Sequence, residues 1–294
     1  MRVMRKSLWA AAAHYSSATS LAKRPLALWV KFAKATLLVS VLNIGVNSAL
    51  AETATDAATN QTPHISVAVQ QAHQAIQQYS VAQGSRLSQL ISQLSLSDND
   101  YWYATAWLRH GQALKHQQKK STLLTLVDQQ IAKQDKYAEQ WRAVKQQIAA
   151  LVPTDRFTIA VHPDRVYADG TSNYLLHAQD KIIIPARPST ISITGFATSL
   201  NLDHQPSQDL NDYLKSATML AMADNSIVWL IKPDTTTLQL PIAYWNKLNT
   251  QTLAPGSIIF VPAKTQIFSE QHQQINQLYL ELLQNQIIGS PQGE

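Results

Sequence analysis

A cluster of aromatic side chains beside an arginine is the part of this sequence whose residue types could bind a ligand. Tyr101, Trp102 and Tyr103 are consecutive, and Trp107 and Arg109 follow closely. Flat aromatic faces bury the C–H surfaces of sugars, and a guanidinium holds carboxylates or phosphates. On a helix, Tyr103 and Trp107 would share one face, and Trp102 and Arg109 would share another. A glycan-binding surface is one interpretation; core packing of a helical layer by these large rings is the other.

Arg156 is a second candidate for ligand contact. Together with Arg187 it brackets a β-rich segment, where ion pairs or turn contacts are the ordinary role of an arginine. The candidate ligand-binding residues are therefore Trp102, Trp107, Arg109 and Arg156.

Signatures of catalysis are absent from the sequence. The chain has no G-x-S-x-G, H-E-x-x-H or G-x-G-x-x-G pattern, its histidines are dispersed, and it contains no cysteine. Paired carboxylates could cleave glycosidic bonds, and Asp98 with Asp100, or Asp203 with Asp209, are the pairs to consider. Capping of a helix start is the favoured explanation of Asp98, and the second pair lies in a loop and at a predicted helix start, so neither pair indicates an active site. We expect no catalytic residues, no metal and no cofactor; a polysaccharide-modifying enzyme that uses paired carboxylates is the alternative.

The N-terminal segment has the order of features that a signal peptidase reads. Seven of the 24 basic residues precede an apolar run at about residues 35–46, which ends at Ala49-Leu50-Ala51. We expect residues 1–51 to be a signal peptide cut after Ala51, and the small polar residues 52–63 to be a flexible leader. An uncleaved anchor is the alternative, but the apolar run is short for a membrane span.

Removal of that segment changes the charge of the chain. The remaining residues carry 17 basic and 19 acidic side chains, a net charge of −2 in place of +5. A chain so close to neutral lacks the clustered Lys and Arg that displace counterions from phosphates, which argues against nucleic acid as a partner. Without cysteine, no disulfide can stabilise the fold in an oxidising compartment.

Hydrophobic periodicity predicts two blocks of β structure separated by helices. Ile65–Val69 alternates as a strand does, and Leu87, Leu90, Ile91 and Leu94 form a helical face with Ser85 as N-cap. The other predicted helical segments are 98–151 (with 101–114 as one of its helices), 207–217 and 266–288. The other predicted strands are 157–161, 180–185, 191–195, 227–231 and 238–240.

An internal repeat organises these elements. Residues 176–186 align with residues 253–263, and each segment is a turn, a short apolar strand and a proline stop. The repeat predicts two similar units in tandem, the first interrupted by helices. We expect a first domain at 64–188 with a helical insertion at about 98–151, a second domain at 189–265, and a C-terminal helix at 266–288.

Short motifs in a fixed order resemble the GfcC-type proteins of group 4 capsule biosynthesis. The resemblance spans about residues 64–288. The motifs that carry it are Gly84-Ser85-Arg86-Leu87, Tyr101-Trp102, Pro153-Thr154-Asp155-Arg156, residues 180–188, Ile193-Thr194-Gly195, Asp212-Tyr213-Leu214, residues 229–234 and residues 255–262. Asp155 and Thr235 depart from the pattern, because glycine is expected in such turns.

The resemblance implies an α+β fold of two tandem β-grasp domains, similar to the SLBB modules of outer-membrane polysaccharide exporters. It also implies a helical insertion in the first domain and a C-terminal amphipathic helix. Its functional implication is a periplasmic, non-enzymatic accessory of capsule or exopolysaccharide biosynthesis and export. The implied partners are surface polysaccharide, outer-membrane export proteins, or both; the mature chain is not expected to be an integral membrane protein.

Overall fold

The computed structural model describes residues 62–95, 97–133, 136–168, 170–243, 251–265 and 270–289. All of them belong to one unit of the chain, Thr59–Glu294. The predicted signal peptide, its cleavage site and nearly all of the predicted leader lie outside the described residues.

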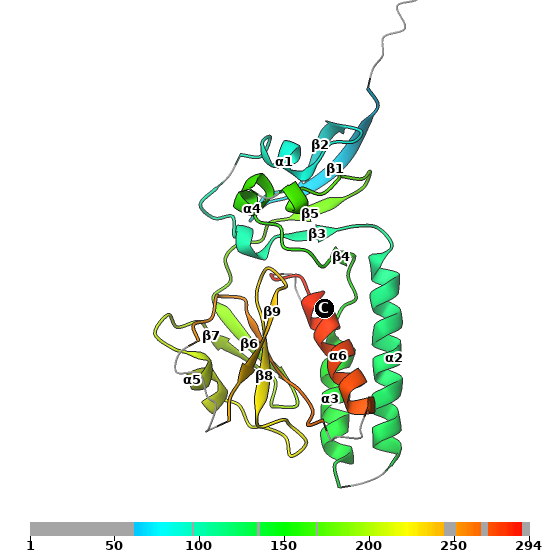
Figure 1. The fold of residues 1–294 in the computed structure, drawn as a ribbon, viewed down its shortest axis with the longest axis vertical. Helices are drawn as coiled ribbons and strands as arrows, with labels where there is room; N and C mark the ends of the chain where they lie inside the picture. The colour runs from blue at the N-terminus through cyan, green and yellow to red at the C-terminus, as the bar shows by residue number, and fades with distance from the viewer. Residues whose placement is uncertain are drawn as a thin grey trace, which may run out of the picture. The chain divides into compact units, whose positions relative to one another are not determined.

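The first sheet contains five short strands in the order β2-β1-β5-β3-β4 (Figure 1). The strands are β1 (His64–Gln70), β2 (Gln77–Ala82), β3 (Ala106–Leu108), β4 (Arg156–Phe157) and β5 (Lys181–Ile183). The central pair β1 and β5 is parallel, and the other pairs are antiparallel. Helices α1 (Leu87–Ile91) and α4 (Pro163–Ala168) contribute apolar side chains to the core of this sheet.

The second sheet repeats this topology, in the order β7-β6-β10-β8-β9. Its strands are β6 (Thr190–Gly195), β7 (Leu200–Asp203), β8 (Ile227–Ile231), β9 (Thr237–Pro241) and β10 (Ile258–Val261). The central pair β6 and β10 is again parallel, and α5 (Leu210–Lys215) follows the first hairpin as α1 does in the first sheet. The repeated segments of the sequence are β5 and β10 with their flanks. The prediction of an α+β fold with two tandem β-grasp units is confirmed.

The helical insertion lies between β3 and β4, the position at which the second sheet has only a tight turn between β8 and β9. It consists of α2 (Gln112–Ala132) and α3 (Ala138–Ala150). Its buried side chains belong to the core of the second sheet. The Trp141 ring meets Phe196 edge-on at 5.2 Å between centroids, and the Gln147 side chain accepts hydrogen bonds from Thr194 Oγ1 and Gly195 N. The first repeat therefore supplies helices that cover the second.

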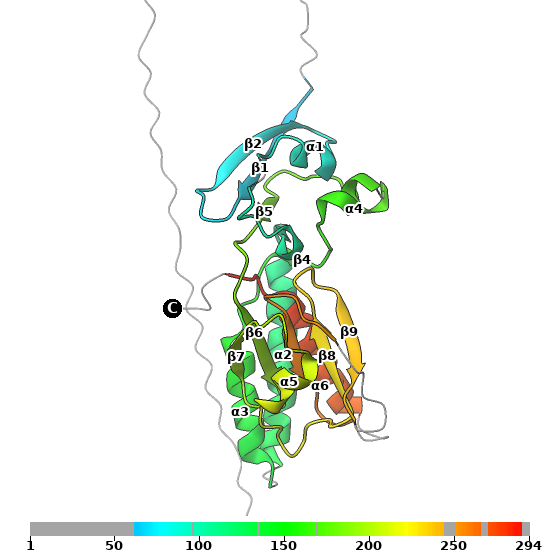
Figure 2. The ribbon, with the colours of Figure 1, turned by 90° about the vertical axis from the view of Figure 1, so that its left-hand side faces the viewer.

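The C-terminal helix α6 (Glu270–Gln284) packs against the same face of the second sheet. Its buried stripe is Ile275, Tyr279, Leu282 and Leu283, and the Tyr279 ring lies 5.1 Å from that of Phe260 on β10. Along β6, Ile191 and Ile193 point to the face of the sheet opposite to that of Thr194 and α6. Helix α5 lies on that opposite face (Figure 2). The second sheet thus has helices packed on both faces.

Three local predictions were wrong. Residues 101–111 are not helical; they form a 3-10 turn (Trp102–Ala104) and strand β3, and the helix begins only at Gln112. The reason is tertiary, because Trp107 pairs with Ile182 of β5 and fills the first core. Strand β4 ends at Phe157, and residues 163–168 are helical. The N-cap of α1 is Arg86, whose backbone N–H donates to the Gln89 side chain, and Ser85 is not the cap.

Asp155 and Thr235, the two positions where the family pattern leads us to expect glycine, differ in backbone conformation. Asp155 has no left-handed backbone, and its carboxylate accepts the Ala113 N–H at the start of α2, 2.7 Å away. Thr235, in the turn between β8 and β9, has φ +70° and is buried. A β-branched residue in this region is strained.

Replacement of Thr235 by glycine should therefore raise the free energy of unfolding by about 1 kcal/mol, because the relieved strain exceeds the added freedom of the unfolded chain. Urea unfolding measures this change. Thr190→Gly in β6 is the matched control and should lower stability by about 0.5–1 kcal/mol. If Thr235→Gly and Thr190→Gly lowered the free energy of unfolding by equal amounts, Thr235 would not be strained.

Candidate functional site

Trp107 is a core residue of the first sheet. Its side chain is 0% exposed, and its ring meets those of Phe157 and Tyr174 edge-on at 6.4 and 6.3 Å between centroids. A ligand could reach this ring only if the core opened.

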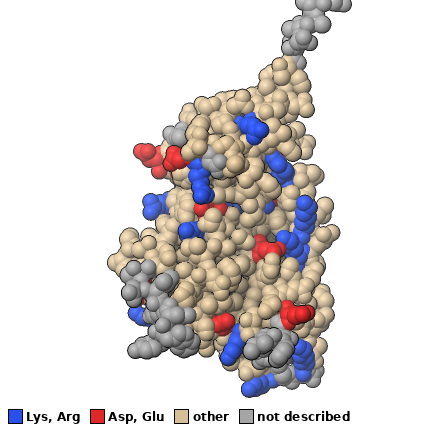
Figure 3. Space-filling model, in the orientation of Figure 1, with Lys and Arg blue, Asp and Glu red and all other residues tan. Residues whose placement is uncertain are grey.

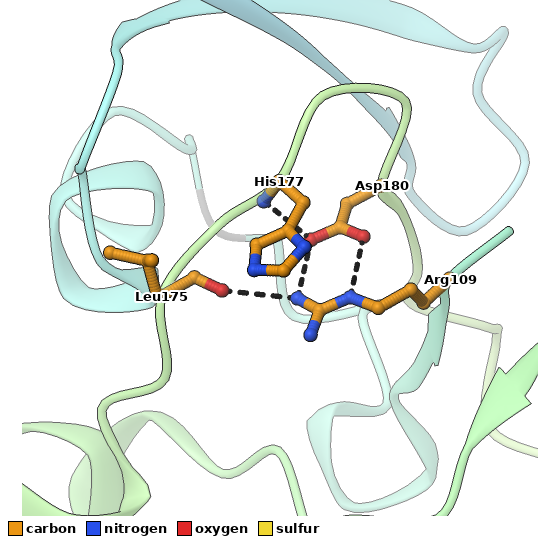
Figure 4. A network of polar contacts seen from close by, with 4 residues as sticks. All are labelled: Arg109, Leu175, His177 and Asp180. Carbon is orange, nitrogen blue, oxygen red and sulfur yellow. Dashed lines mark hydrogen bonds and ion pairs between the residues drawn. The ribbon is translucent and has the colours of Figure 1, made fainter.

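Arg109 ties the end of β3 to the turn before β5 (Figure 4). Its Nε and Nη2 donate to the two carboxylate oxygens of Asp180 at 3.0 and 2.8 Å, and Nη2 also donates to the Leu175 carbonyl. Asp180 is buried and accepts the His177 N–H as well. The guanidinium lies 5.0 Å from the Trp107 ring centroid. Most of its donors are therefore already used within the fold.

Arg156 is buried where the first repeat meets the second. Its side chain is 3% exposed and donates to the carbonyls of Gln286, Thr105 and Pro233. Burial lowers the pKa of Arg156 to about 10, while the nearby Asp234 carboxylate favours the charged form. The guanidinium thus joins β4 to the β8–β9 turn and to the chain after α6.

Trp102 is partly buried against the first core, and its indole N–H has no hydrogen-bond partner among the residues that the structure describes. Of the four candidates, Trp107 and Arg109 are in contact, and their other contacts are with residues of the first sheet and its turns. The sequence-predicted residues do not form a ligand surface together.

Asp100 and Asp209, one acid from each proposed carboxylate pair, accept hydrogen bonds within the fold. Asp100 is buried and accepts hydrogen bonds from the Gln71 side chain and from the backbone N–H groups of Ala72 and Ser97. Asp209 caps α5 by accepting two N–H groups of its first turn. Capping therefore explains Asp209, whereas Asp100 is held in a buried hydrogen-bond network.

A groove of ≈ 560 Å³ lies beside α6, over strands β8 and β9. We call it the Trp229 groove. Because α6 stacks on β10 through Tyr279 and Phe260, the two strands beyond β10 are left uncovered on this face. Trp229 of β8 pairs in register with Gln239 of β9, so their side chains share this face of the sheet. Half-buried Trp229 and exposed Gln239 form the floor of the groove.

The wall of the groove is one face of α6. Gln273, Gln277, Leu280 and Gln284 follow each other at helical spacing and all line it, together with Glu281. Gln277 donates to Glu281 and Gln284 donates to the Thr235 carbonyl, which fixes these side chains. The wall is therefore a row of amides beside an apolar Leu280.

Two carboxylates give the groove its charge. Asp224 and Glu281 line it, and no Lys or Arg does so among the described residues. Lys119 of α2 pairs with Glu281 at 2.7 Å. Burial alone would raise the pKa of Glu281, but hydrogen bonds from Lys119 and Gln277 hold it below its ordinary value. Around α6, β8 and β9 the surface in Figure 3 is mostly uncharged, with isolated acidic and basic side chains.

Sequence reasoning missed this groove. Its signals were the Gln-rich polar face of the last helix and a tryptophan within an apolar strand, which become one site only when α6 lies beside β8. Among the described residues, no three His, Cys, Asp or Glu side chains group as a metal site would require. Within the same ranges, no helix is long and apolar enough to cross a membrane.

Comparisons with known proteins assign the chain to a family. The model for the N-terminal part of capsule biosynthesis GfcC matches residues 61–184, and the model for the GfcC C-terminal part matches residues 198–288. The chain is 31% identical over 205 residues to the uncharacterized protein YjbG of Escherichia coli (strain K12), covering 68% of this chain and 82% of that protein. With this match and the tandem topology in agreement, the chain belongs to the GfcC family of capsule biosynthesis proteins.

Proposed function

We propose that the protein is a periplasmic, non-enzymatic accessory of capsule or exopolysaccharide biosynthesis and export, and that it binds a segment of the glycan in the Trp229 groove. Family membership supports the role in capsule biosynthesis. The groove is the observation that supports glycan as the direct ligand. We assign residues 1–51 as the signal peptide, 64–188 and 189–265 as the two domains, and 266–288 as the C-terminal helical segment.

The chemistry of the groove suits sugars. The indole face of Trp229 offers flat apolar surface for sugar C–H groups, and its polar tip can hydrogen-bond. The side chains of Gln239 and Gln273 make no hydrogen bond to other described residues, so each offers a carbonyl and an amide N–H to hydroxyl groups. A concave site with aromatic lining and a few polar groups is the common form of a small-molecule site.

An enzymatic role is the second candidate, since Asp224 and Glu281 both line the groove. A glycosidase needs a general acid whose pKa is raised. The pKa of Glu281 is lowered instead, because Lys119 and Gln277 stabilise its charged form. This electrostatic environment supports binding without cleavage.

A protein of the export machinery is the other partner to consider. Docking through the apolar stripe of the C-terminal helix would require that stripe to be exposed, but Ile275, Tyr279 and Leu282 are buried on the second sheet. We therefore place glycan ahead of a protein partner as the ligand of this region.

Trp229→Ala tests the proposal. Loss of the indole should weaken binding of purified surface polysaccharide by about tenfold or more, since stacking on one aromatic face contributes on the order of 1.4 kcal/mol. Affinity electrophoresis of residues 52–294 in gels containing the polysaccharide measures this as lost retardation.

Tyr167→Ala is the matched control, because Tyr167 is a 59% exposed aromatic residue on α4 and does not line the groove. It should be retarded like the unmodified protein. Equal retardation of Trp229→Ala and the unmodified protein would contradict glycan binding in this groove.

A further inference from the structure

The charges of the Trp229 groove limit which sugars it can accept. Its lining contains two carboxylates, Asp224 and Glu281, and no cation among the residues that the structure describes. A uronic acid or a phosphate substituent needs an arginine or lysine partner, or at least an uncharged pocket. In this groove such a group would meet charges of its own sign.

Arg109 and Arg156, the candidate ligand-binding arginines, form hydrogen bonds within the fold, away from the Trp229 groove. Arg109 forms a paired hydrogen bond with Asp180, and Arg156 donates to three backbone carbonyls. Neither lines the groove. Lys119 of α2 is paired with Glu281 at 2.7 Å. Its charge partly offsets one carboxylate and leaves Asp224 without an ion-pair partner among the described residues.

The same carboxylates are good acceptors for sugar hydroxyl groups. The Asp224 Oδ1 atom accepts the Ser226 N–H at 2.8 Å, and the second carboxylate oxygen accepts no hydrogen bond from the described residues. Hydrogen bonds from hydroxyl to carboxylate are charge-assisted and short. With the free amides of Gln239 and Gln273, the lining offers acceptors and neutral donors but no cationic donor.

Resting on the proposed function, we infer that the Trp229 groove binds uncharged, hydroxyl-rich sugar residues and excludes sugars that carry carboxylate or phosphate groups. On an acidic polysaccharide, the protein would therefore contact the neutral residues of the repeating unit.

The test uses neutral and acidic polysaccharides of matched linkage. A soluble β-1,4-glucan and its C6-oxidised counterpart, β-1,4-glucuronan, are cast into separate gels, and the retardation of the full mature chain is measured at low salt. We expect the neutral polymer to retard the protein with at least about tenfold lower dissociation constant than the glucuronan, with a ratio that shrinks in high salt. Trp229→Ala should weaken the retardation by each polymer.

Asp224→Asn with Glu281→Gln should selectively improve binding of the glucuronan, whereas Asp164→Asn, an exposed acid on α4, should change neither affinity. Glucuronan binding equal to or tighter than glucan binding would overturn the inference and leave the proposed function intact. If neither polymer and no purified surface polysaccharide retards the protein, the proposed function itself fails, and the inference with it.

Discussion

Replacement of Arg156 by alanine should lower the free energy of unfolding by about 3–5 kcal/mol, the loss expected when one partner of a buried polar network is removed. The three carbonyls of Gln286, Thr105 and Pro233 would lose their donor inside the structure. Urea unfolding followed by tryptophan fluorescence measures the loss.

Arg142→Ala is the matched control, because Arg142 is a 49% exposed arginine on α3 that pairs with Glu139 within its own helix. It should change stability by less than about 0.5 kcal/mol. If Arg156→Ala were as stable as this control but lost glycan binding, Arg156 would be a ligand contact, as its sequence position first suggested.

Replacement of Trp107 by alanine should lower the free energy of unfolding by about 3–5 kcal/mol, the range measured for large aromatic side chains deleted from cores. The ring is fully buried between Phe157, Tyr174 and the guanidinium of Arg109.

Trp229→Ala provides the comparison within the same protein. It should lose glycan retardation with a smaller loss of stability, whereas Trp107→Ala at a temperature where it remains folded should keep retardation. If a folded Trp107→Ala protein no longer bound glycan, the ligand would instead bind at the cluster predicted from the sequence, which includes Trp107 and Arg109.

The sequence predicted most regular elements because their patterns are locally consistent. Strands such as Ile191–Gly195 and Ile227–Ile231 are runs of β-branched residues bounded by turns, and the amphipathic stripes of α2 and α3 extend over several helical turns. Gly195, part of a family-like motif, has φ +99°, and a Cβ there would lie 2.4 Å from the Val261 carbonyl oxygen, so only glycine fits.

The wrong or missing predictions concern short segments whose conformation depends on tertiary contacts. Strand β3 has three residues, too few to show an alternating pattern, and its aromatic neighbours also fit a helical face. The edge strands β2 and β7 are short and contain polar residues at half of their positions, so neither forms an apolar run. Only β3 has a partner distant in the sequence, β5, whereas β2 and β7 each pair with the preceding strand in a hairpin.

The groove was beyond sequence reasoning for the same reason. Trp229 and Gln239 become neighbours through the register of a hairpin, and α6 becomes their wall through the contact of Tyr279 with Phe260. The sequence did show a Gln-rich helix face, but its position over β8 and β9 depends on how three separate segments pack.

The insertion between β3 and β4 has a consequence for the order of folding. Residues of α2 and α3 are synthesised before β6 to β10, whose core they complete, so Leu123, Trp141 and Val144 cannot be buried against the second sheet until the C-terminal half is present. Conversely, the second sheet made alone would expose Phe196 and Phe260. The second repeat therefore cannot complete its core without the insertion of the first, and the slow step of folding should be the long-range closure that brings the two together.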